Sequence, residues 1–186
     1  MTETATAPLL YTVGHGTRPA EEFVAILRGA GVRRLVDVRT APGSRKHPQF
    51  GREGLTGSLE PAGIEYVWRK DLGGWRKPRP DSPHVALRSS GFRGYADHMD
   101  TDEFDRAIRW LIETSAWPTA IMCAESTWWR CHRRMIADAL TARGCTVVHL
   151  MSDARQQPHR LHPSARLEGT RVIYDREAGD QQRLAT

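Results

Sequence analysis

The chain has 186 residues, of which 39% are hydrophobic, enough to build the core of one domain. Six tryptophans, four tyrosines and four phenylalanines argue against a disordered chain, and no stretch approaches the roughly 20 apolar residues of a membrane span. The net charge of +5 favours an anionic partner, either a nucleic acid or an anionic small molecule such as a nucleotide or phosphorylated metabolite.

The cysteines and the first residues of the chain favour a cytoplasmic location. Three cysteines in strand-like or helix-like contexts indicate reduced thiols rather than a disulfide framework. The opening segment, MTETATAPLLYTVGHG, has neither the basic start nor the long apolar run of a signal peptide. We therefore expect a cytoplasmic protein without a membrane partner.

The chain begins with a predicted strand, helix and second strand. The run LLYTV at 9–13 is apolar and ends at a Gly-His-Gly turn. Thr17 suits the N-cap of the helix that follows, Pro19 suits its first turn, and Gly31 suits its end. The next strand is VRRLVDVR at 32–39, and a strand-helix-strand unit of this kind is expected to pair in parallel.

The same alternation continues after a loop at 40–54. We predict a short helix at 55–60, a strand at 63–69 and a long connection at 70–100. A helix at 101–116, a strand at 119–123, a helix at 128–143 and a strand at 146–150 are predicted to follow. Trp75, Phe92 and Tyr95 in the long connection favour an ordered covering loop over a disordered one. The segment 165–174 alternates about a Glu-Gly pair and predicts a small hairpin.

These elements predict an α/β fold: a single domain with a mostly parallel, roughly five-stranded sheet flanked by helices, plus a small C-terminal hairpin. We place the domain at 9–175, between flexible tails at 1–8 and 176–186. Ligands of such sheets bind at the carboxyl ends of the strands, near a topological switch point. The residues that follow each strand are therefore the candidates for a site.

Polar residues follow several of the predicted strands. We predict that the catalytic residues are His15, Asp37, Cys123, Glu125 and His132. We predict that the substrate is bound by Arg39, Arg45, Arg93, Tyr95 and Arg133. The enzyme interpretation requires the five catalytic residues to face one cavity. The competing interpretation is that all of them are structural, for example that the Asp-x-Arg pair is an internal ion pair.

The stretch MCAESTWWRCHRR at 122–134 favours an anion site but leaves its chemistry open. A phosphatase- or rhodanese-type loop needs Cys and Arg six positions apart, and neither Cys123 nor Cys131 has an arginine there. Zinc could use Cys123, Cys131 and His132, but adjacent helical side chains point about 100° apart, so we assign no metal ligand. A thiolate of either cysteine beside a histidine and several arginines could be a nucleophile.

A fourth possibility uses carboxylates. Glu125 or Asp37 could act as nucleophile or general base, with His15 or His132 as the proton partner. Glycosidic-bond chemistry on a nucleoside or DNA base would suit this set and the basic surface. No cofactor is specified by any of the four.

Several motifs resemble those of the family called domain of unknown function 488. They are the Gly-His-Gly turn (14–16), the Val-Asp-Val-Arg strand (36–39) and the Ser-Arg loop that ends in Pro-Gln-Phe (44–50), followed by Phe-Arg-Gly-Tyr-Ala (92–96), Cys-Ala-Glu (123–125) and Cys-His-Arg (131–133). The likeness runs from about Tyr11 to Tyr174. Many relatives have Lys-x-Pro after Cys-Ala-Glu, where this chain has STWW. The resemblance implies an α/β fold and a shared site, and it implies no activity.

We therefore expect an enzyme, hydrolase- or transferase-like, that acts on an anionic, phosphate-bearing substrate such as a nucleotide or nucleic acid. The alternative is a non-catalytic nucleic-acid-binding or DNA-repair-associated module. Its support is the isoelectric point of about 9.5, the arginine-rich loops, and the pair Trp128-Trp129, which could stack on bases. The oligomeric state is left open.

Overall fold

The computed structural model describes residues 7–43, 46–151 and 155–176, so most of the two predicted tails lies outside the described residues. Six strands form one sheet and two form a hairpin. The strands are β1 (Leu9–Gly14), β2 (Arg34–Asp37), β3 (Glu65–Trp68), β4 (Thr119–Cys123), β5 (Thr146–Leu150), β6 (Gln156–Pro158), β7 (Ala165–Glu168) and β8 (Arg171–Tyr174). The helices are α1 (Ala20–Gly29), α2 (Arg52–Leu59), α3 (Ser90–Met99), α4 (Asp102–Glu113) and α5 (Arg133–Thr141).

The sheet has the order β3-β2-β4-β1-β5-β6, and all its pairs are parallel except β5-β6. The α/β fold with a C-terminal hairpin is therefore confirmed. The sheet has a sixth strand because Gln156–Pro158 adds antiparallel to β5 at the edge. Strand β4 lies at the centre, between two strands that precede it by about 80 and 110 residues of chain.

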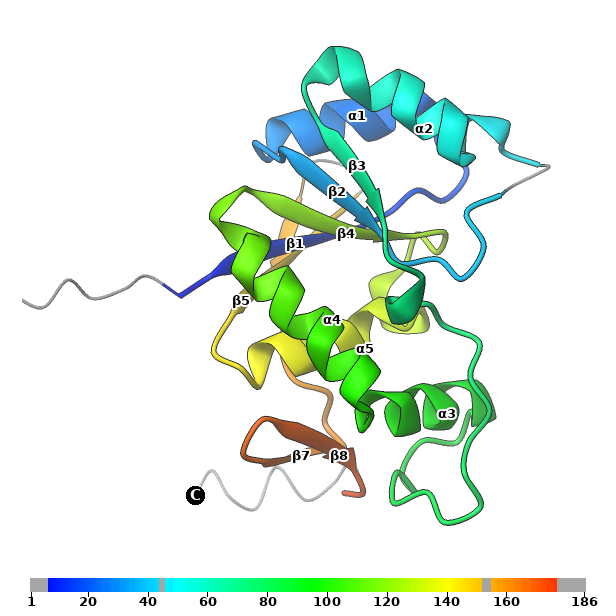
Figure 1. Ribbon diagram of the computed structural model, residues 1–186, viewed down its shortest axis with the longest axis vertical. Coiled ribbons are helices and arrows are strands. Elements are labelled where there is room, and N and C mark those ends of the chain that lie inside the picture. The colour runs from blue at the N-terminus through cyan, green and yellow to red at the C-terminus, as the bar shows by residue number, and fades with distance from the viewer. Residues whose placement is uncertain (1–6, 44–45, 152–154, 177–186) are drawn as a thin grey trace, which may run out of the picture.

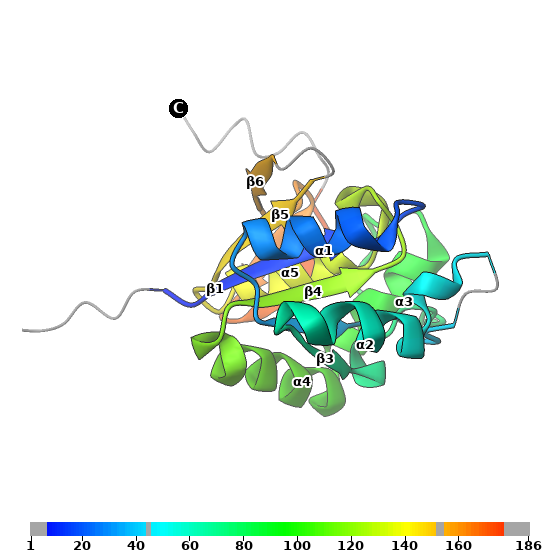
Figure 2. The same cartoon turned by 90° about the horizontal axis from the view of Figure 1, so that it is seen from above.

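The helices cover the sheet in two layers (Figures 1 and 2). Helices α1 and α2 lie on one face, and α3, α4 and α5 lie on the other together with the hairpin β7-β8. Each layer has its own apolar core. The core under α1 and α2 includes Val13, Leu35 and Phe50, while the core under α4 and α5 includes Val36 and Ile121. Alternate residues of a strand thus serve opposite cores, as the pleat requires.

The long connection predicted as a covering loop contains helix α3. Its N-cap is Ser89, whose hydroxyl accepts a hydrogen bond from the Phe92 amide at 3.5 Å. A Cβ at Gly94 would lie 2.3 Å from the Arg76 carbonyl oxygen, so only glycine allows α3 to pack this closely on the preceding loop. Two glycines and few apolar residues had hidden the helix from the hydrophobic pattern.

The helix predicted at 128–143 begins later than expected. A single 3₁₀ turn covers Trp128–Arg130, Cys131 is extended with φ −127° and ψ 154°, and α5 starts at Arg133. The 3₁₀ turn is held on the outer strands, because the Trp128 ring stacks on His149 with ring centres 4.0 Å apart. Cys131 and His132 therefore do not point about 100° apart as neighbours in a helix would.

No helix within the described ranges of the chain is long and apolar enough to cross a membrane. Helix α4 illustrates the ordinary amphipathic pattern, since it buries Phe104, Ile108 and Leu111 and is capped by the Thr101 hydroxyl.

Candidate functional site

The predicted catalytic residues divide between the two faces of the sheet. His15 and Asp37 lie on the α1-α2 side, where the His15 ring stacks on Phe50 with ring centres 4.2 Å apart. Cys123 belongs to the core on the α4-α5 side. The backbone register explains this division, because Gly14 pairs with Cys123 and Asp37 pairs with Met122. Residues one step from a paired position point to the opposite face, so the five residues do not face one cavity. They cannot act together in one site, and any enzymatic role has to rest on a subset of them.

Asp37 is part of a buried ion pair on the α1-α2 side. Its carboxylate accepts hydrogen bonds from Arg39 Nε at 2.9 Å and Nη2 at 2.6 Å, and from the Tyr66 hydroxyl at 2.7 Å. The Arg39 amide adds a further bond at 3.0 Å. Burial and the hydrogen bond to Asp37 raise the pKa of Tyr66, so this phenol stays protonated and donates. With these partners the carboxylate acts as the counter-ion of Arg39.

His15 belongs to the same cluster. Its Nδ1 lies 2.8 Å from the Gly16 carbonyl oxygen, which makes Nδ1 the donor and leaves Nε2 to accept from Arg39 Nη1 at 3.3 Å. Burial, followed by the nearby Arg39 cation, lowers the pKa of His15 to about 4. His15 is therefore a neutral, fixed ring near pH 7.

Two thiols and a histidine form the second cluster, on the α4-α5 side. Cys123 and Cys131 lie close enough for each to shift the pKa of the other, and Cys131 Sγ lies 3.5 Å from His132 Nδ1. His132 Nε2 lies 3.0 Å from the Val38 carbonyl oxygen. A carbonyl can only accept, so Nε2 carries a hydrogen and Nδ1 is aimed at the Cys131 sulfur. A nucleophile, a base and a group that orients the base are thus in line.

Arg133 supplies a positive charge behind this thiol pair. Its side chain is 1% exposed and donates from Nε to Cys123 Sγ at 2.9 Å and from Nη2 to the Glu125 carbonyl oxygen at 2.6 Å. Within the described part of the chain no carboxylate contacts this guanidinium. A buried guanidinium without a carboxylate in contact favours negative charge close by, and the adjacent sulfur pair could supply it as a thiolate.

The two thiols do not ionise independently, because each shifts the pKa of the other. Burial alone would raise the pKa of Cys131, but Cys123 and the adjacent His132 and Arg133 lower it well below its usual range. Burial and the neighbouring Cys131 raise the pKa of Cys123. These directions favour Cys131 over Cys123 as the position of a thiolate.

Cys131 and His132 line a cavity of about 500 Å³. Three cations stand around this cavity, namely Arg76, Lys77 and Arg130, and Glu125 also lines it. Trp75, Phe92 and Tyr95 add aromatic residues to the lining. The cavity therefore combines a thiol and a histidine with a basic and aromatic wall, a combination that would suit an anionic ligand.

The loop over the cavity is closely fitted to His132. A Cβ at Gly74 would lie 3.0 Å from His132 Nδ1, so glycine lets the backbone approach the imidazole. The loop is tied down because the Thr40 hydroxyl donates to the Gly74 carbonyl oxygen at 2.9 Å and the Tyr95 hydroxyl donates to that of Leu72 at 2.8 Å. Trp75 has φ of 65° and is 94% exposed. An anchored loop thus holds a strained, exposed aromatic residue at the mouth of the cavity.

Residues 19–140, well over half of the chain, match the family model described as Domain of unknown function DUF488. The chain belongs to this family. No curated protein and no solved structure matches it. The DUF488 match covers both cysteines of the pair, His132 and the loop over the cavity, while β1 and β5 lie outside it.

The predicted substrate-binding residues are mostly placed elsewhere. Arg39 is paired with Asp37, and Arg133 lies behind the sulfurs. The Arg93 side chain donates to the Leu87 carbonyl oxygen at 2.9 Å, away from the cavity lining. Tyr95 lines the cavity, and Arg45 lies outside the described residues. The cations that do line the cavity come from a Gly-Gly-Trp-Arg-Lys segment and from the 3₁₀ turn. In the sequence, only the two cations after Gly-Gly-Trp indicate that this segment could bind an anion.

Among residues 7–43, 46–151 and 155–176, no group of three or more His, Cys, Asp or Glu side chains could hold a metal ion, so the zinc alternative has no ligand set there. In the tryptophan pair considered for base stacking, the Trp128 ring packs on His149 and its Nε1 donates to Gln157 at 3.2 Å, while Trp129 is 46% exposed.

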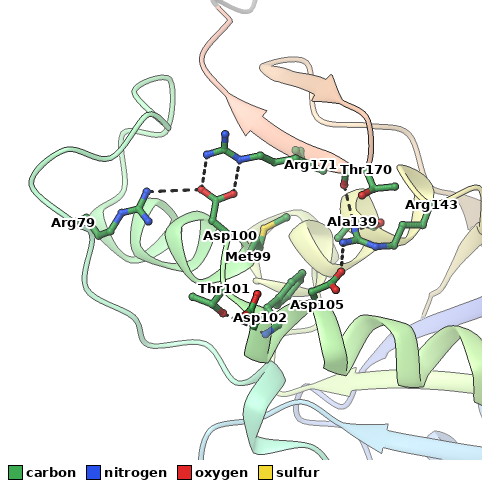
Figure 3. A pocket seen from close by; sticks show the side chains of 12 residues that line it. Arg79, Met99, Asp100, Thr101, Asp102, Asp105, Ala139, Arg143, Thr170 and Arg171 are labelled. Atoms are coloured by element: carbon green, nitrogen blue, oxygen red, sulfur yellow. Dashed lines mark hydrogen bonds and ion pairs between the residues drawn. The ribbon is translucent and has the colours of Figure 1, made fainter.

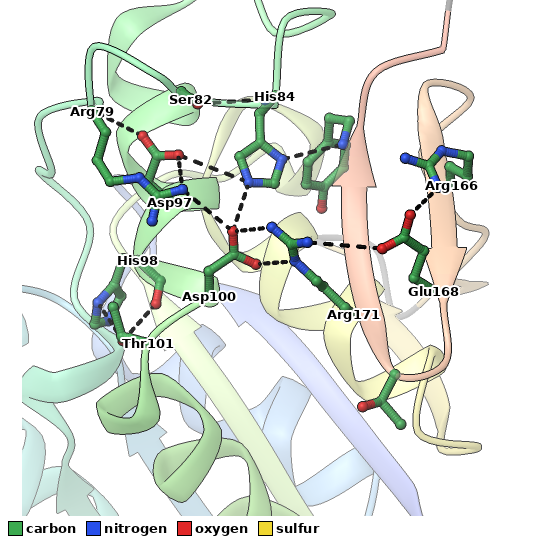
Figure 4. A network of polar contacts seen from close by, with 12 residues as sticks. Arg79, Ser82, His84, Asp97, His98, Asp100, Thr101, Arg166, Glu168 and Arg171 are labelled. Carbon is green, nitrogen blue, oxygen red and sulfur yellow. Dashed lines mark hydrogen bonds and ion pairs between the residues drawn. The ribbon is translucent and has the colours of Figure 1, made fainter.

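A second polar region lies between α3 and the hairpin. The cavity in Figure 3 is lined by charges that already pair, since Asp100 accepts from Arg171 at 2.7 Å and Asp105 accepts from Arg143 at 2.9 Å. In Figure 4 the buried His84 faces Asp100 at 3.5 Å and accepts from the Tyr174 amide at 3.2 Å. This network fastens the hairpin to α3, which gives it a structural role.

Proposed function

We propose that this protein is a thiol-dependent hydrolase or acyl transferase that acts on an anionic substrate, with Cys131 as the nucleophile. The single observation that carries the proposal is the Cys131-His132 pair at 3.5 Å, oriented by the Val38 carbonyl and open to a basic cavity. A low thiol pKa, a fixed base and an anion-attracting wall are what such chemistry requires.

The reaction would run in two balanced steps. In the reactive state the Cys131 proton has passed to His132 Nδ1. The Cys131 thiolate attacks an acyl carbon and forms a C–S bond, the bond from that carbon to the leaving nitrogen or oxygen breaks, and His132 Nδ1 gives its proton to the leaving group. Water, or the acceptor in a transferase, then attacks the thioester carbon and gives a proton to His132 Nδ1, and the C–S bond breaks to release the acyl product and the Cys131 thiolate. Arg76, Lys77 and Arg130 would hold the anionic part of the substrate.

The test combines labelling with burst kinetics. Iodoacetamide alkylation of the folded protein, mapped by mass spectrometry from pH 5 to 9, should modify Cys131 with a midpoint at least one unit below that of Cys145. Cys145 is a matched reference, because it is also a buried free cysteine and burial raises its pKa. Mono-p-nitrophenyl succinate should give a burst of about one p-nitrophenolate per chain in wild type and Cys145→Ser, and none in Cys131→Ser.

A comparison of an anionic with a neutral ester tests whether the cations of the cavity attract a negatively charged substrate. The succinate ester should react at least tenfold faster than neutral p-nitrophenyl butyrate, and Arg130→Ala should reduce this preference. The proposal is wrong if Cys131 is alkylated only in the pH range of Cys145, or if Cys131→Ser keeps the burst.

We also propose a test of the nucleic-acid-binding module, which one observation favours: Trp75 is 94% exposed and is followed by two cations at the cavity. A stacking role predicts that wild type binds single-stranded oligonucleotide with an affinity that falls as salt rises, and that Trp75→Ala weakens it. Binding that is absent, or insensitive to both changes, would exclude this function.

A further inference from the structure

Five buried polar side chains form a continuous hydrogen-bonded series behind the sulfur pair. We call it the buried chain, and its members in order are Arg133, Thr12, His149, His159 and Asp138. Arg133 Nη1 lies 3.2 Å from Thr12 Oγ1, and Thr12 Oγ1 lies 2.7 Å from His149 Nδ1. His149 Nε2 lies 2.9 Å from His159 Nδ1, and His159 Nε2 lies 2.9 Å from Asp138 Oδ1.

With both histidines neutral, the hydrogen bonds of the buried chain run in one direction. A guanidinium can only donate, so Thr12 accepts from Arg133, and an ionised carboxylate can only accept, so His159 Nε2 donates to Asp138. A neutral His159 then accepts at Nδ1 from His149 Nε2, and His149 Nδ1 accepts from the Thr12 hydroxyl. Burial, followed by the nearby His159 and Arg133, lowers the pKa of His149 to about 3, so this ring is neutral near pH 7.

The buried chain is shielded from water along its length. Thr12 and Asp138 are both 0% exposed, and the side chain of His159 is 1% exposed. Asp138 is held in place by the Tyr174 hydroxyl at 2.7 Å and by the His162 amide at 3.0 Å. A set of polar groups this deeply buried is costly unless every member is paired, and here the cation at one end and the carboxylate at the other make the series electrically balanced.

We propose that the buried chain positions the reactive thiol, by fixing the Arg133 guanidinium against the sulfur pair and by linking it to a remote counter-charge. Its positioning residues are Thr12, His149, His159 and Asp138. The inference rests on the proposed function. It explains why no carboxylate of the described residues contacts Arg133: a carboxylate beside it would compete with the sulfur pair for the guanidinium, whereas one at the far end of a hydrogen-bonded series stabilises the cation and leaves Nε to Cys123.

Other charged and titratable groups also face the thiol pair, and the test must hold them constant. They are Tyr95 on α3, Arg76 and Lys77 on the loop, Glu125 and Arg130 after β4, and His132 and Arg133 at the start of α5. None is a member of the buried chain except Arg133. Variants are therefore made only at Thr12 and Asp138, which lie outside the cavity lining.

The experiment measures the pH midpoint of Cys131 alkylation by iodoacetamide in the full chain, with Cys145 as internal reference. Thr12→Val removes the acceptor for Arg133 and should raise the midpoint by about one unit, which makes alkylation about tenfold slower below it. Thr12→Ser keeps the hydroxyl and should leave the midpoint unchanged. Asp138→Asn keeps the acceptor for His159 but removes the charge, and should lower the midpoint by about a few tenths of a unit.

Positioning by the buried chain predicts that the alkylation midpoint shifts in opposite directions in Thr12→Val and Asp138→Asn. A general loosening of the structure would instead move the midpoints of both variants toward that of Cys145. The inference is overturned if Thr12→Val has the wild-type midpoint, or if Thr12→Val and Asp138→Asn shift in the same direction. If Thr12→Val does not unfold cooperatively, Asp138→Asn alone decides, and an unchanged midpoint overturns the inference. A wild-type midpoint equal to that of Cys145 is a different result, because it contradicts the proposed function itself.

Discussion

The two polar clusters at the carboxyl edge of the sheet differ in how their charges are balanced. On the α1-α2 side the Asp37 carboxylate meets the Arg39 guanidinium directly, and its oxygens also accept from a phenol and an amide. On the α4-α5 side the Arg133 guanidinium meets a sulfur, and its counter-charge Asp138 lies at the far end of the buried chain. A cluster balanced internally stabilises a fold, whereas the second cluster, whose cation meets a sulfur next to the cavity-lining Cys131, is the one on which the proposed thiol chemistry rests.

The largest effect on stability is expected from a variant that removes the carboxylate of the buried Asp37-Arg39 ion pair. Asp37→Ala leaves the buried Arg39 without its partner and should lower the free energy of unfolding by about 3–5 kcal/mol, measured by urea denaturation. The matched control is Glu65→Ala, which removes the partner of Arg34 from a more exposed ion pair of 2.6 Å. That change should cost less than about 1 kcal/mol. Equal losses in the two variants would contradict a structural role for Asp37.

Lowering the pH is expected to decrease the free energy of unfolding through His15, which belongs to the cluster around Asp37 and Arg39. The pKa of His15 is about 4 in the folded protein, against about 6.5 for a free histidine, so the unfolded chain binds the proton first as pH falls. Its contribution to stability, on the order of 2–3 kcal/mol, is therefore complete above pH 6.5 and lost as pH falls to 4. His15→Asn keeps a donor for the Gly16 carbonyl but cannot titrate.

Urea denaturation at several pH values between 4 and 7 checks this prediction. The dependence of stability on pH should be weaker in His15→Asn than in wild type. The prediction fails if the two curves are parallel across that window.

The smallest expected effect concerns the cavity of the other cluster. Trp75→Gly relieves a φ of 65° and loses little packing, so the free energy of unfolding should rise by about 0.5–1 kcal/mol. Trp117 is a half-exposed tryptophan with φ of −96°, and its ring lies under Arg33 and Arg34. Trp117→Gly should therefore destabilise the protein. A loss of stability in both variants would show that Trp75 is not strained.

The sequence predicts where the strands of the sheet lie along the chain, but not which face of the sheet a side chain at a strand end occupies. Each sheet strand predicted from an apolar run is present, and the hairpin turns at Gly169 with φ of 61° as the Glu-Gly pair indicated. Cys123 and His15 were expected together because both follow strands. The register decides otherwise, since a shift of one residue reverses the face and no single strand encodes its alignment with a neighbour.

Cys131 was recognised as a reactive candidate but was not chosen over Cys123. The divergence of its side chain from that of His132 in a helix starting at Trp128 counted only against a shared zinc ion, and the helix in fact starts later, after the extended Cys131. The buried chain was not foreseen at all. Its members come from β1, β5, α5 and the segment after β6, and each alone resembles an ordinary core or loop residue. Only tertiary packing brings such distant groups into hydrogen-bonding contact.

The central position of β4 also determines when the thiol pair can be assembled during folding. Strands β1 and β2 do not pair with each other, and the gap between them stays open until residues 119–123 enter it. Parallel pairings between segments so far apart in the chain form slowly, because a long loop must close before any contact stabilises it. Cys123 reaches its neighbours on β1 only once β4 has entered this gap. The rate at which Cys131 becomes reactive after dilution from denaturant would therefore report completion of the sheet.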